Sequence, residues 1–285
     1  MNLTEIHNVP ATIPTPLRIQ EYGVGIFIGA QTKSALKKKL KKGLVSVNDE
    51  TATTATMISG GECIRLSAPT EVGPEKKLVF PLKVLFEDDH LAVVHKPAGI
   101  LVSGNRFKTI ANALPQNLRP SPLPDGTRPQ PVHRLDYPTT GTLLIGKTSS
   151  SIRALNGLFA DKRISKEYFA VAIGNMDKEG IIVADVDGKR SESRYEVHHS
   201  VASERFSRLN LVAVRPATGR RHQIRRHLSG IGNPILGDKT YGTEGLILNG
   251  KGLYLHAHSL TFVHPFTHQE MVVTSELPIR FEKLF

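Results

Sequence analysis

The chain has 285 residues, of which 39% are hydrophobic and 22% charged, so it can form one large or two smaller globular domains. No apolar run approaches the length of about 18 residues that a membrane span needs, and the polar amino terminus lacks the apolar core of a secretory signal. A single cysteine, Cys63, excludes an internal disulfide framework and a multi-cysteine metal centre. These features favour a cytoplasmic protein without a membrane partner.

The charge of the chain points to a polyanionic partner. Lysine and arginine number 37 against 26 acidic residues, which gives a formal net charge of +11 and a pI near 9.8. Such an excess steers a protein toward RNA, DNA or an acidic membrane surface. Because the basic residues are clustered, nucleic acid is the favoured partner.

Residues 1–67 are predicted to be an amino-terminal arm followed by a small separate domain. The arm, over 1–16, is polar and contains three prolines. Ser34 is predicted to cap a short lysine-rich helix that ends at Gly43. Strands are expected at 44–48 and after the Gly-Gly turn that precedes Cys63. Candidate nucleic-acid contacts on this helix are Lys37, Lys38 and Lys41.

The segment 68–81 contains Pro and Gly without a clear period, which predicts a linker to a second domain over 82–285. Strands outnumber helices in that domain and do not alternate regularly with them, so an α+β fold with a mixed sheet is predicted. The five prolines of 119–131 predict a coil or loop. Strands are expected over 84–89, 91–96, 142–147, 167–174, 180–186, 193–198, 209–214, 253–263 and 270–275, and helices over 109–114, 149–161 and 220–229, the last with Thr218 as a possible cap.

One motif suggests a nucleotide site. Gly141–Thr148 fits the phosphate-loop pattern GxxxxGK[ST], which would make the chain an NTPase. The pattern is filled with Leu143, Leu144 and Ile145, which favour a buried strand over an exposed loop. His256 and His258 share a strand face, but no acidic ligand is near them in the sequence, so a structural role is favoured over a metal site.

Three other segments concentrate polar residues: Pro131–Gly141 with an Asp in a turn, Ile164–Gly174 with a Lys and a Tyr on a strand, and Arg215–Leu228 with five arginines in twelve residues. Taken singly, each fits a capped turn, an amphipathic edge strand or a solvated basic helix face. Together they are consistent with a site that processes a polyanion, but they do not specify a reaction.

These segments resemble the motifs of the RluA-type pseudouridine synthases. The stretches that carry the resemblance are HRLDYPTTG, KEYFAVAIG and TGRRHQIRRHLSGIGNPILGDKTYG, with VLFEDDHLAVVHKPAGILV and LYLHAHSLTFVHP as the opening and closing strands. They span about 82–285 in five ordered blocks. Residues 17–67 resemble, more loosely, the small alpha-L RNA-binding domain that often precedes this catalytic domain. The resemblance implies a mostly antiparallel central sheet with flanking helices.

The resemblance also implies an isomerase that converts uridine in ribosomal or transfer RNA to pseudouridine without a cofactor or metal, and a monomer is expected. In this reading Asp136 is the catalytic carboxylate, Tyr168 lies against the target ring, and Arg225 is the partner of the Asp. Arg134 enters the vacated base stack, and Ile224 packs behind the uracil. The remaining residues expected to bind RNA or substrate are Lys166, Arg220, Arg221, His222 and Arg226.

Two positions depart from the family pattern: Thr140 stands where Ser is usual, and Tyr137 stands where Arg is common. A non-catalytic RNA-binding or ribosome-associated protein that keeps the fold remains an alternative function. The residues do not indicate which RNA is the target, or whether Asp136 attacks the base or the sugar or acts as a base.

Overall fold

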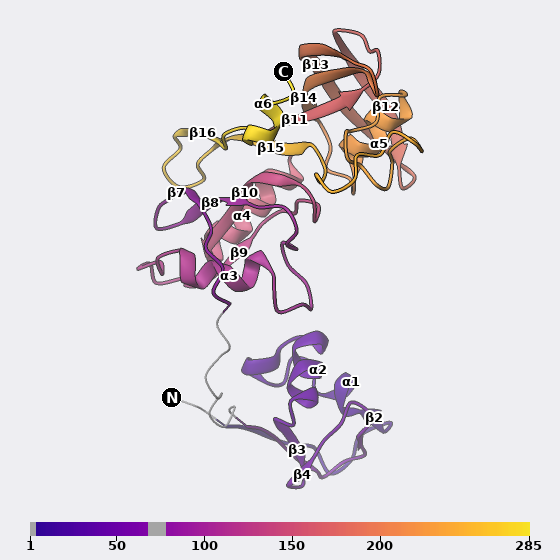
Figure 1. Cartoon of the computed structure of the whole chain (residues 1–285). Coiled ribbons are helices and arrows are strands. Elements are labelled where there is room, and N and C mark those ends of the chain that lie inside the picture. The colour runs from indigo at the N-terminus through magenta and orange to yellow at the C-terminus, as the bar shows by residue number, and fades with distance from the viewer. Residues whose placement is uncertain (1–3, 68–77) are drawn as a thin grey trace. The chain divides into compact units, whose positions relative to one another are not determined.

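The computed structural model describes residues 4–67 and 78–285 (Figure 1). Contacts between backbone positions divide the chain into two compact units, Met1–Lys76 and Lys77–Phe285. Most of the predicted linker, 68–77, lies outside the described residues. No helix among the described residues is long and apolar enough to cross a bilayer.

The amino-terminal unit has a four-stranded sheet in the order β1-β6-β3-β4 and a small β2-β5 sheet. Part of the predicted arm is therefore built into a sheet, because β1 pairs antiparallel with β6 from Glu5–Leu66 to Asn8–Cys63. The elements are β1 (Glu5–Asn8), β2 (Leu17–Arg18), α1 (Ile19–Tyr22), η1 (Ile28–Ala30), α2 (Lys33–Lys41), β3 (Val45–Val47), β4 (Glu50–Thr51), β5 (Met57–Ile58) and β6 (Cys63–Leu66).

Helix α2 is the lysine-rich helix that the sequence predicts. Leu36 and Leu40 are buried in the core of the unit, one turn apart on the same face. The predicted cap was wrong by two residues. The side chain of Thr32, and not Ser34, accepts the hydrogen bond from the Ala35 N–H, because Thr32 has the extended backbone that an N-cap needs.

The second unit is an α+β fold built on a ten-stranded sheet whose main path is β12-β13-β14-β11-β15-β10-β8-β7. Strand β10 pairs with β15 in parallel at Thr140 and Gly141, and the other pairings given for this sheet are antiparallel. The strands are β7 (Val84–Glu87), β8 (Leu91–Lys96), β9 (Gly126–Pro131), β10 (Thr140–Thr148), β11 (Ser165–Ile173), β12 (Glu179–Val186), β13 (Lys189–Ser203), β14 (Ser207–Pro216), β15 (Leu255–Val263) and β16 (Glu270–Thr274).

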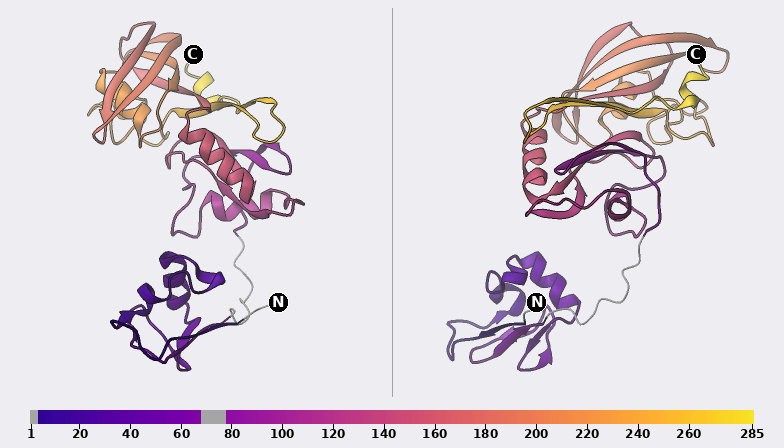
Figure 2. Two further views of the ribbon diagram at one scale, coloured as in Figure 1. Left: turned by 180° about the vertical axis from the view of Figure 1, so that it is seen from behind. Right: turned by 90° about the vertical axis from the view of Figure 1, so that its left-hand side faces the viewer.

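Four helices accompany this sheet: α3 (Ile110–Asn117), α4 (Ser149–Ala160), α5 (Gln223–Gly230) and α6 (Ile279–Glu282). Helix α4 packs on β10, and α5 packs on β12, β13 and β14 (Figures 1 and 2). The amphipathic patterns place Leu155 of α4 and Leu228 of α5 in the core, both fully buried. The sheet thereby brings β10, β11 and α5 into one neighbourhood.

Two predictions for this unit were wrong. The proline-rich segment 119–131 is not all loop, because β9 pairs with β10 between Pro131–Ile145 and Gly126–Thr148. Within the described part of the chain, β9 pairs with β10 alone. A strand at a sheet edge tolerates prolines because its outer N–H groups need no partner. Thr218 does not cap α5, whose N-cap is His222 in a left-handed conformation with φ +55°.

Gly141–Thr148 lies within the strand β10, and all nine residues of that strand, Thr140–Thr148, are buried. The Nζ of Lys147 is 2.7 Å from Glu87 Oε1 and donates to the Asp88 carbonyl. A phosphate-binding loop needs exposed backbone N–H groups and a free lysine. In this structure, neither requirement of an NTPase site is met at this motif.

Candidate active site

Asp136 lies in the turn between β9 and β10, and a buried lysine holds that turn. The Lys96 ammonium donates to the carbonyls of Pro97, Tyr137 and Thr139 at 3.0, 3.2 and 2.8 Å. Its side chain is fully buried at the end of β8. Burial lowers the pKa of Lys96 to about 8, and the nearby charge of Asp136 opposes that shift. Lys96 thus ties the main chain on the carboxyl side of Asp136 to the neighbouring strand.

Two histidines fix the flanks of the same turn. The His133 ring accepts a hydrogen bond from the Leu144 N–H at 2.9 Å, which requires a neutral imidazole. Burial lowers the pKa of His133 to about 3, in agreement with that role. Thr140 Oγ1 is 2.8 Å from His256 Nδ1, so the threonine that departs from the family pattern joins β10 to β15 through its hydroxyl. Tyr137, the other departure, is about half exposed.

The start of α5 is organised by the side chain of Gln223. Its Oε1 accepts hydrogen bonds from the Thr218 hydroxyl and the Arg220 N–H, and its Nε2 donates to Glu192 and Ser193. This buried amide supplies hydrogen-bond partners for the irregular chain before α5, whose N-terminus has no side-chain cap. The following turn of α5 carries Ile224 and Arg225 inward, and both are buried.

Arg225 lies between two carboxylates. Its Nη1 is 3.5 Å from Asp136 Oδ2, while its Nε and Nη2 donate to the two oxygens of Asp238 at 2.7 and 2.8 Å. Burial disfavours the charged guanidinium, but the hydrogen bond and charge of Asp238, with the smaller effect of Asp136, raise the pKa of Arg225. Arg225 and Asp136 thus lie close together, as expected from the sequence, but the two-pronged contact of Arg225 is made with Asp238.

His222 and Tyr168 complete the surroundings of Asp136. His222 Nε2 is 3.7 Å from Asp136 Oδ1, and its Nδ1 is 2.9 Å from the Tyr241 hydroxyl. Desolvation lowers the pKa of His222, although the charge of Asp136 opposes the shift. Tyr168 of β11 packs against the buried clusters that contain Leu135 and Ile224. Burial, followed by the charge of Asp136, raises the pKa of Tyr168, so the phenol stays neutral.

The remaining predicted residues divide into three groups. Arg134, Arg220 and Arg221 are exposed. Lys166 is partly buried, which lowers its pKa, and its Nζ donates to the Thr218 carbonyl at 3.4 Å. Arg226 is held by Asp187 at 2.8 Å and by the Tyr241 hydroxyl at 3.1 Å. The lysines of α2 belong to the other unit: Lys37, Lys38 and Lys41.

Three residues of this neighbourhood escape the sequence analysis: Lys96, Asp238 and Tyr241. Asp238 and Tyr241 stand within the stretch GDKTYG, whose pairing of an acid with an aromatic just after α5 was the available signal. Lys96 ends an apolar strand, and a lysine there is ordinarily assigned to solvent. Residues 4–67 and 78–285 contain no group of three His, Cys, Asp or Glu side chains placed to hold a metal.

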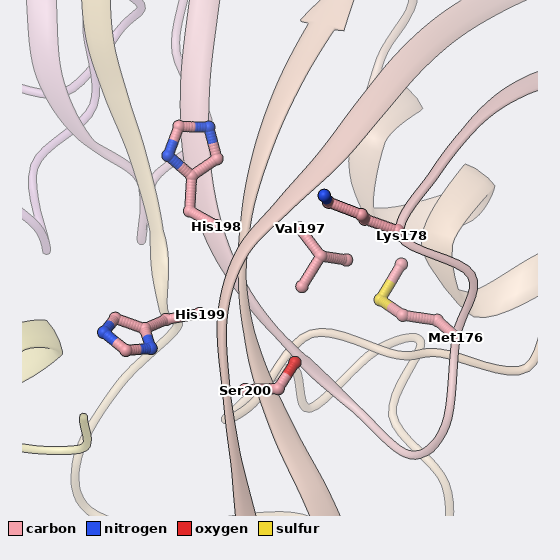
Figure 3. A pocket seen from close by; sticks show the side chains of 6 residues that line it. All are labelled: Met176, Lys178, Val197, His198, His199 and Ser200. Carbon is pink, nitrogen blue, oxygen red and sulfur yellow. The ribbon is translucent and has the colours of Figure 1, made fainter.

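A separate shallow hollow lies at the bulge of β13, between Val197 and His199. Figure 3 shows Lys178 and Met176 on one side of the β13 ribbon and the rings of His198 and His199 on the other. It shares no residue with the group around Asp136.

Comparison with known proteins identifies the family. A family model described as RNA pseudouridylate synthase matches residues 90–230. Ribosomal large subunit pseudouridine synthase D of Nitrosomonas europaea is 33% identical over 87% of this chain and 77% of its own length. Ribosomal large subunit pseudouridine synthase C of Vibrio vulnificus is 33% identical over 88% of this chain and 87% of its own length.

Solved structures of RNA pseudouridylate synthases share the fold of this chain. Human RNA Pseudouridylate Synthase Domain Containing 4 superposes with a TM-score of 0.57 and 25% identity, over 70% of this chain and 90% of that one. Human RNA Pseudouridylate Synthase Domain Containing 1 has the same fold, with a TM-score of 0.56 over 68% of this chain and 83% of that one. With a ten-stranded α+β sheet and relatives aligned over most of its length, the chain belongs to the RluA-type family of RNA pseudouridine synthases, enzymes that isomerise uridine in RNA to pseudouridine.

Proposed function

We propose that Asp136 is the catalytic carboxylate of this enzyme. The observation that carries the proposal is the convergence of three side chains on one carboxylate: Arg225 of α5 lies 3.5 Å from it, His222 lies 3.7 Å from it, and Tyr168 of β11 packs against the cluster that contains the neighbouring Leu135. Asp136 remains partly open, with 23% of its side chain exposed, whereas its two basic neighbours are more enclosed. An ionised, oriented and accessible carboxylate is what covalent or general-base chemistry requires.

The reaction breaks the bond between the sugar and a ring nitrogen of uracil and forms a bond between the same sugar carbon and a ring carbon. That ring carbon gives up a proton and the nitrogen gains one, so nothing is oxidised. The base must first leave its stack, at a cost of a few kcal/mol. Tyr168 and Ile224 are proposed to line the position of the displaced uracil, since both pack in the same core cluster and Ile224 precedes Arg225, which contacts Asp136. Arg134, which is exposed two residues earlier, is proposed to occupy the gap in the stack.

Ribosomal RNA of the large subunit is the proposed substrate, because the relatives named above are described as large-subunit synthases. Basic side chains around Asp136 would contact phosphates: Lys166, Arg220, Arg221 and Arg226. The amino-terminal unit is proposed to be an alpha-L-like RNA-binding domain that uses Lys37, Lys38 and Lys41 of α2. We further propose that the enzyme acts as a monomer in the cytoplasm.

The test of Asp136 is a conservative substitution. Asp136→Asn keeps the size of the side chain but removes the carboxylate, so it should abolish the release of tritium from ribosomal RNA labelled at the uracil carbon that loses its hydrogen. Binding of the same RNA in a filter assay should change little. Asp185→Asn, which removes the same charge from an exposed position on β12, is the matched control and should remain active.

Turnover by Asp136→Asn within tenfold of the unsubstituted enzyme would reject the assignment. The target is tested separately, by mapping pseudouridine in total RNA from a strain that lacks this protein. A missing site in transfer RNA, with an unchanged large-subunit RNA, would refute the proposed substrate.

A further inference from the structure

The guanidinium of Arg225 makes its two shortest hydrogen bonds with Asp238. Both of its contacts with Asp238 are shorter than 2.9 Å, whereas its single contact with Asp136 is 3.5 Å. Arginine binds a carboxylate most strongly through two parallel N–H groups. Asp238 therefore binds the two parallel N–H groups, on Nε and Nη2, through which a free Arg225 could bind Asp136.

Asp238 is itself held on all sides. Its side chain is fully buried, and its Oδ1 also accepts the N–H groups of Thr240 and Tyr241 at 2.9 and 3.1 Å. Burial alone would raise the pKa of Asp238, but the bonds to Arg225 and Thr240 lower it, so the group stays ionised. Four donated hydrogen bonds fix both the charge and the direction of this carboxylate.

The main chain before Asp238 is anchored to the sheet. Ile235 bridges Ala172 of β11, the Leu236 N–H donates to Val171, and the Leu236 carbonyl accepts from Tyr254. Gly237 turns the chain with φ +78°, and a Cβ at this position would lie 1.9 Å from the Gly252 carbonyl oxygen. The segment that leads into Asp238 is thus hydrogen-bonded to β11 and to Tyr254, just before β15.

The same short segment also supports the other basic groups near Asp136. The ring of Tyr241 lies 5.0 Å from the guanidinium carbon of Arg225. Its hydroxyl contacts Arg226 Nε and His222 Nδ1. The segment 237–242 therefore contacts three basic side chains of this region: Arg225, Arg226 and His222.

We propose that Asp238 is a positioning residue for the isomerisation: it holds the Arg225 fork so that one N–H group faces Asp136 while the Asp136 carboxylate keeps its freedom to react. Without Asp238, the guanidinium is free to turn and bind Asp136 through both of its prongs, which would leave the reactive oxygens occupied. This inference rests on the proposed role of Asp136. It makes Asp238 necessary for turnover although Asp238 does not touch the substrate.

The test compares kcat and KM for the full-length protein on ribosomal RNA. Asp238→Asn keeps one oxygen for the Thr240 and Tyr241 N–H groups but cannot accept both prongs of Arg225. We expect kcat to fall by about 100-fold, the order of effect of a misplaced catalytic group, with KM unchanged. Asp88→Asn is the matched control. Asp88 also accepts two backbone N–H groups and a side-chain donor, His264, and its loss should leave kcat unchanged.

A double-substitution cycle separates positioning from general support of the fold. Arg225→Lys keeps the positive charge but loses the planar fork. If Asp238 acts through Arg225, Asp238→Asn should cost less than threefold in the Arg225→Lys background. An equal cost in both backgrounds, or a folded Asp238→Asn enzyme with kcat within threefold of the original, would overturn the inference.

Two further outcomes are informative. If Asp238→Asn does not fold, as judged by circular dichroism, Arg225→Lys alone carries the test, and wild-type kcat in that variant overturns the inference. Asp136→Asn is measured in parallel. Activity in Asp136→Asn would remove the proposed function, whereas an inactive Asp136→Asn beside a fully active Asp238→Asn would remove only the role of Asp238.

Discussion

His256 should make the stability of the catalytic unit sensitive to mild acid. Its ring is fully buried between β10 and the end of β16, with Nδ1 2.8 Å from the Thr140 hydroxyl and Nε2 3.1 Å from the Ser275 carbonyl. A carbonyl only accepts, so Nε2 carries the proton and Nδ1 accepts from Thr140. Burial lowers the pKa of His256 to about 4, although the hydrogen bond to the Ser275 carbonyl opposes that shift.

The folded and unfolded chains protonate His256 at different pH values. As pH falls through the ordinary histidine value of about 6.5, the unfolded chain takes up a proton that the folded chain refuses until about pH 4. The full stability is present above pH 6.5 and is lost progressively as pH falls toward 4. One pKa unit is worth about 1.4 kcal/mol, so His256 alone should remove about 2 kcal/mol between pH 7 and pH 5.

The measurement is urea unfolding at the two pH values, followed by circular dichroism because the chain has no tryptophan. His256→Gln does not titrate and can still donate to Ser275. It should be less stable at pH 7, but it should lose about 2 kcal/mol less than the original protein on going to pH 5. His198→Gln, at an exposed ring on β13, should follow the original protein. If His256→Gln and the original lose the same free energy, the burial argument is refuted.

Three other predictions follow from particular contacts. Lys147→Met should lower the free energy of unfolding in urea by about 3 kcal/mol, because it leaves the enclosed Glu87 carboxylate without its buried lysine. Adding Glu87→Gln should recover part of that loss. Binding of ATP by the original protein that is lost in Lys147→Met would contradict the assignment of this segment to a strand. Gly141→Ala should prevent normal folding, since its Cβ would lie 2.0 Å from the Ala257 oxygen. Gly157→Ala, on the open side of α4, should instead raise the free energy of unfolding in urea by about 0.5–1 kcal/mol. A fragment beginning at Lys77 should keep the Asp136 site but bind RNA with a shallower salt dependence than the full chain, and an unchanged slope would exclude an RNA contact by the amino-terminal unit.

Local patterns in the sequence predict most of the elements correctly. The alternation in LVSVN and the apolar filling of Gly141–Thr148 predict β3 and β10, because a period of two or a short apolar run bounded by turns specifies a strand. The spacing of Leu36 and Leu40 likewise predicts α2. The misplaced cap and the missed β9 are errors of local detail, since both depend on backbone conformation and on which strand has a free edge.

The grouping of charges around Asp136 was decided by the tertiary structure. The motifs predict that Arg225 lies near Asp136, and the two residues are 89 positions apart in the chain. They do not predict that Asp238 takes the arginine fork, or that Lys96 binds three carbonyls of the Asp136 turn and the segment beside it. A charged side chain in a sequence is ordinarily assigned to solvent, because burial of an unpaired charge is costly. Its partner is settled only when the parallel contact of β10 with β15 and the packing of α5 on the sheet bring distant segments together, and those contacts have no local signature in the sequence.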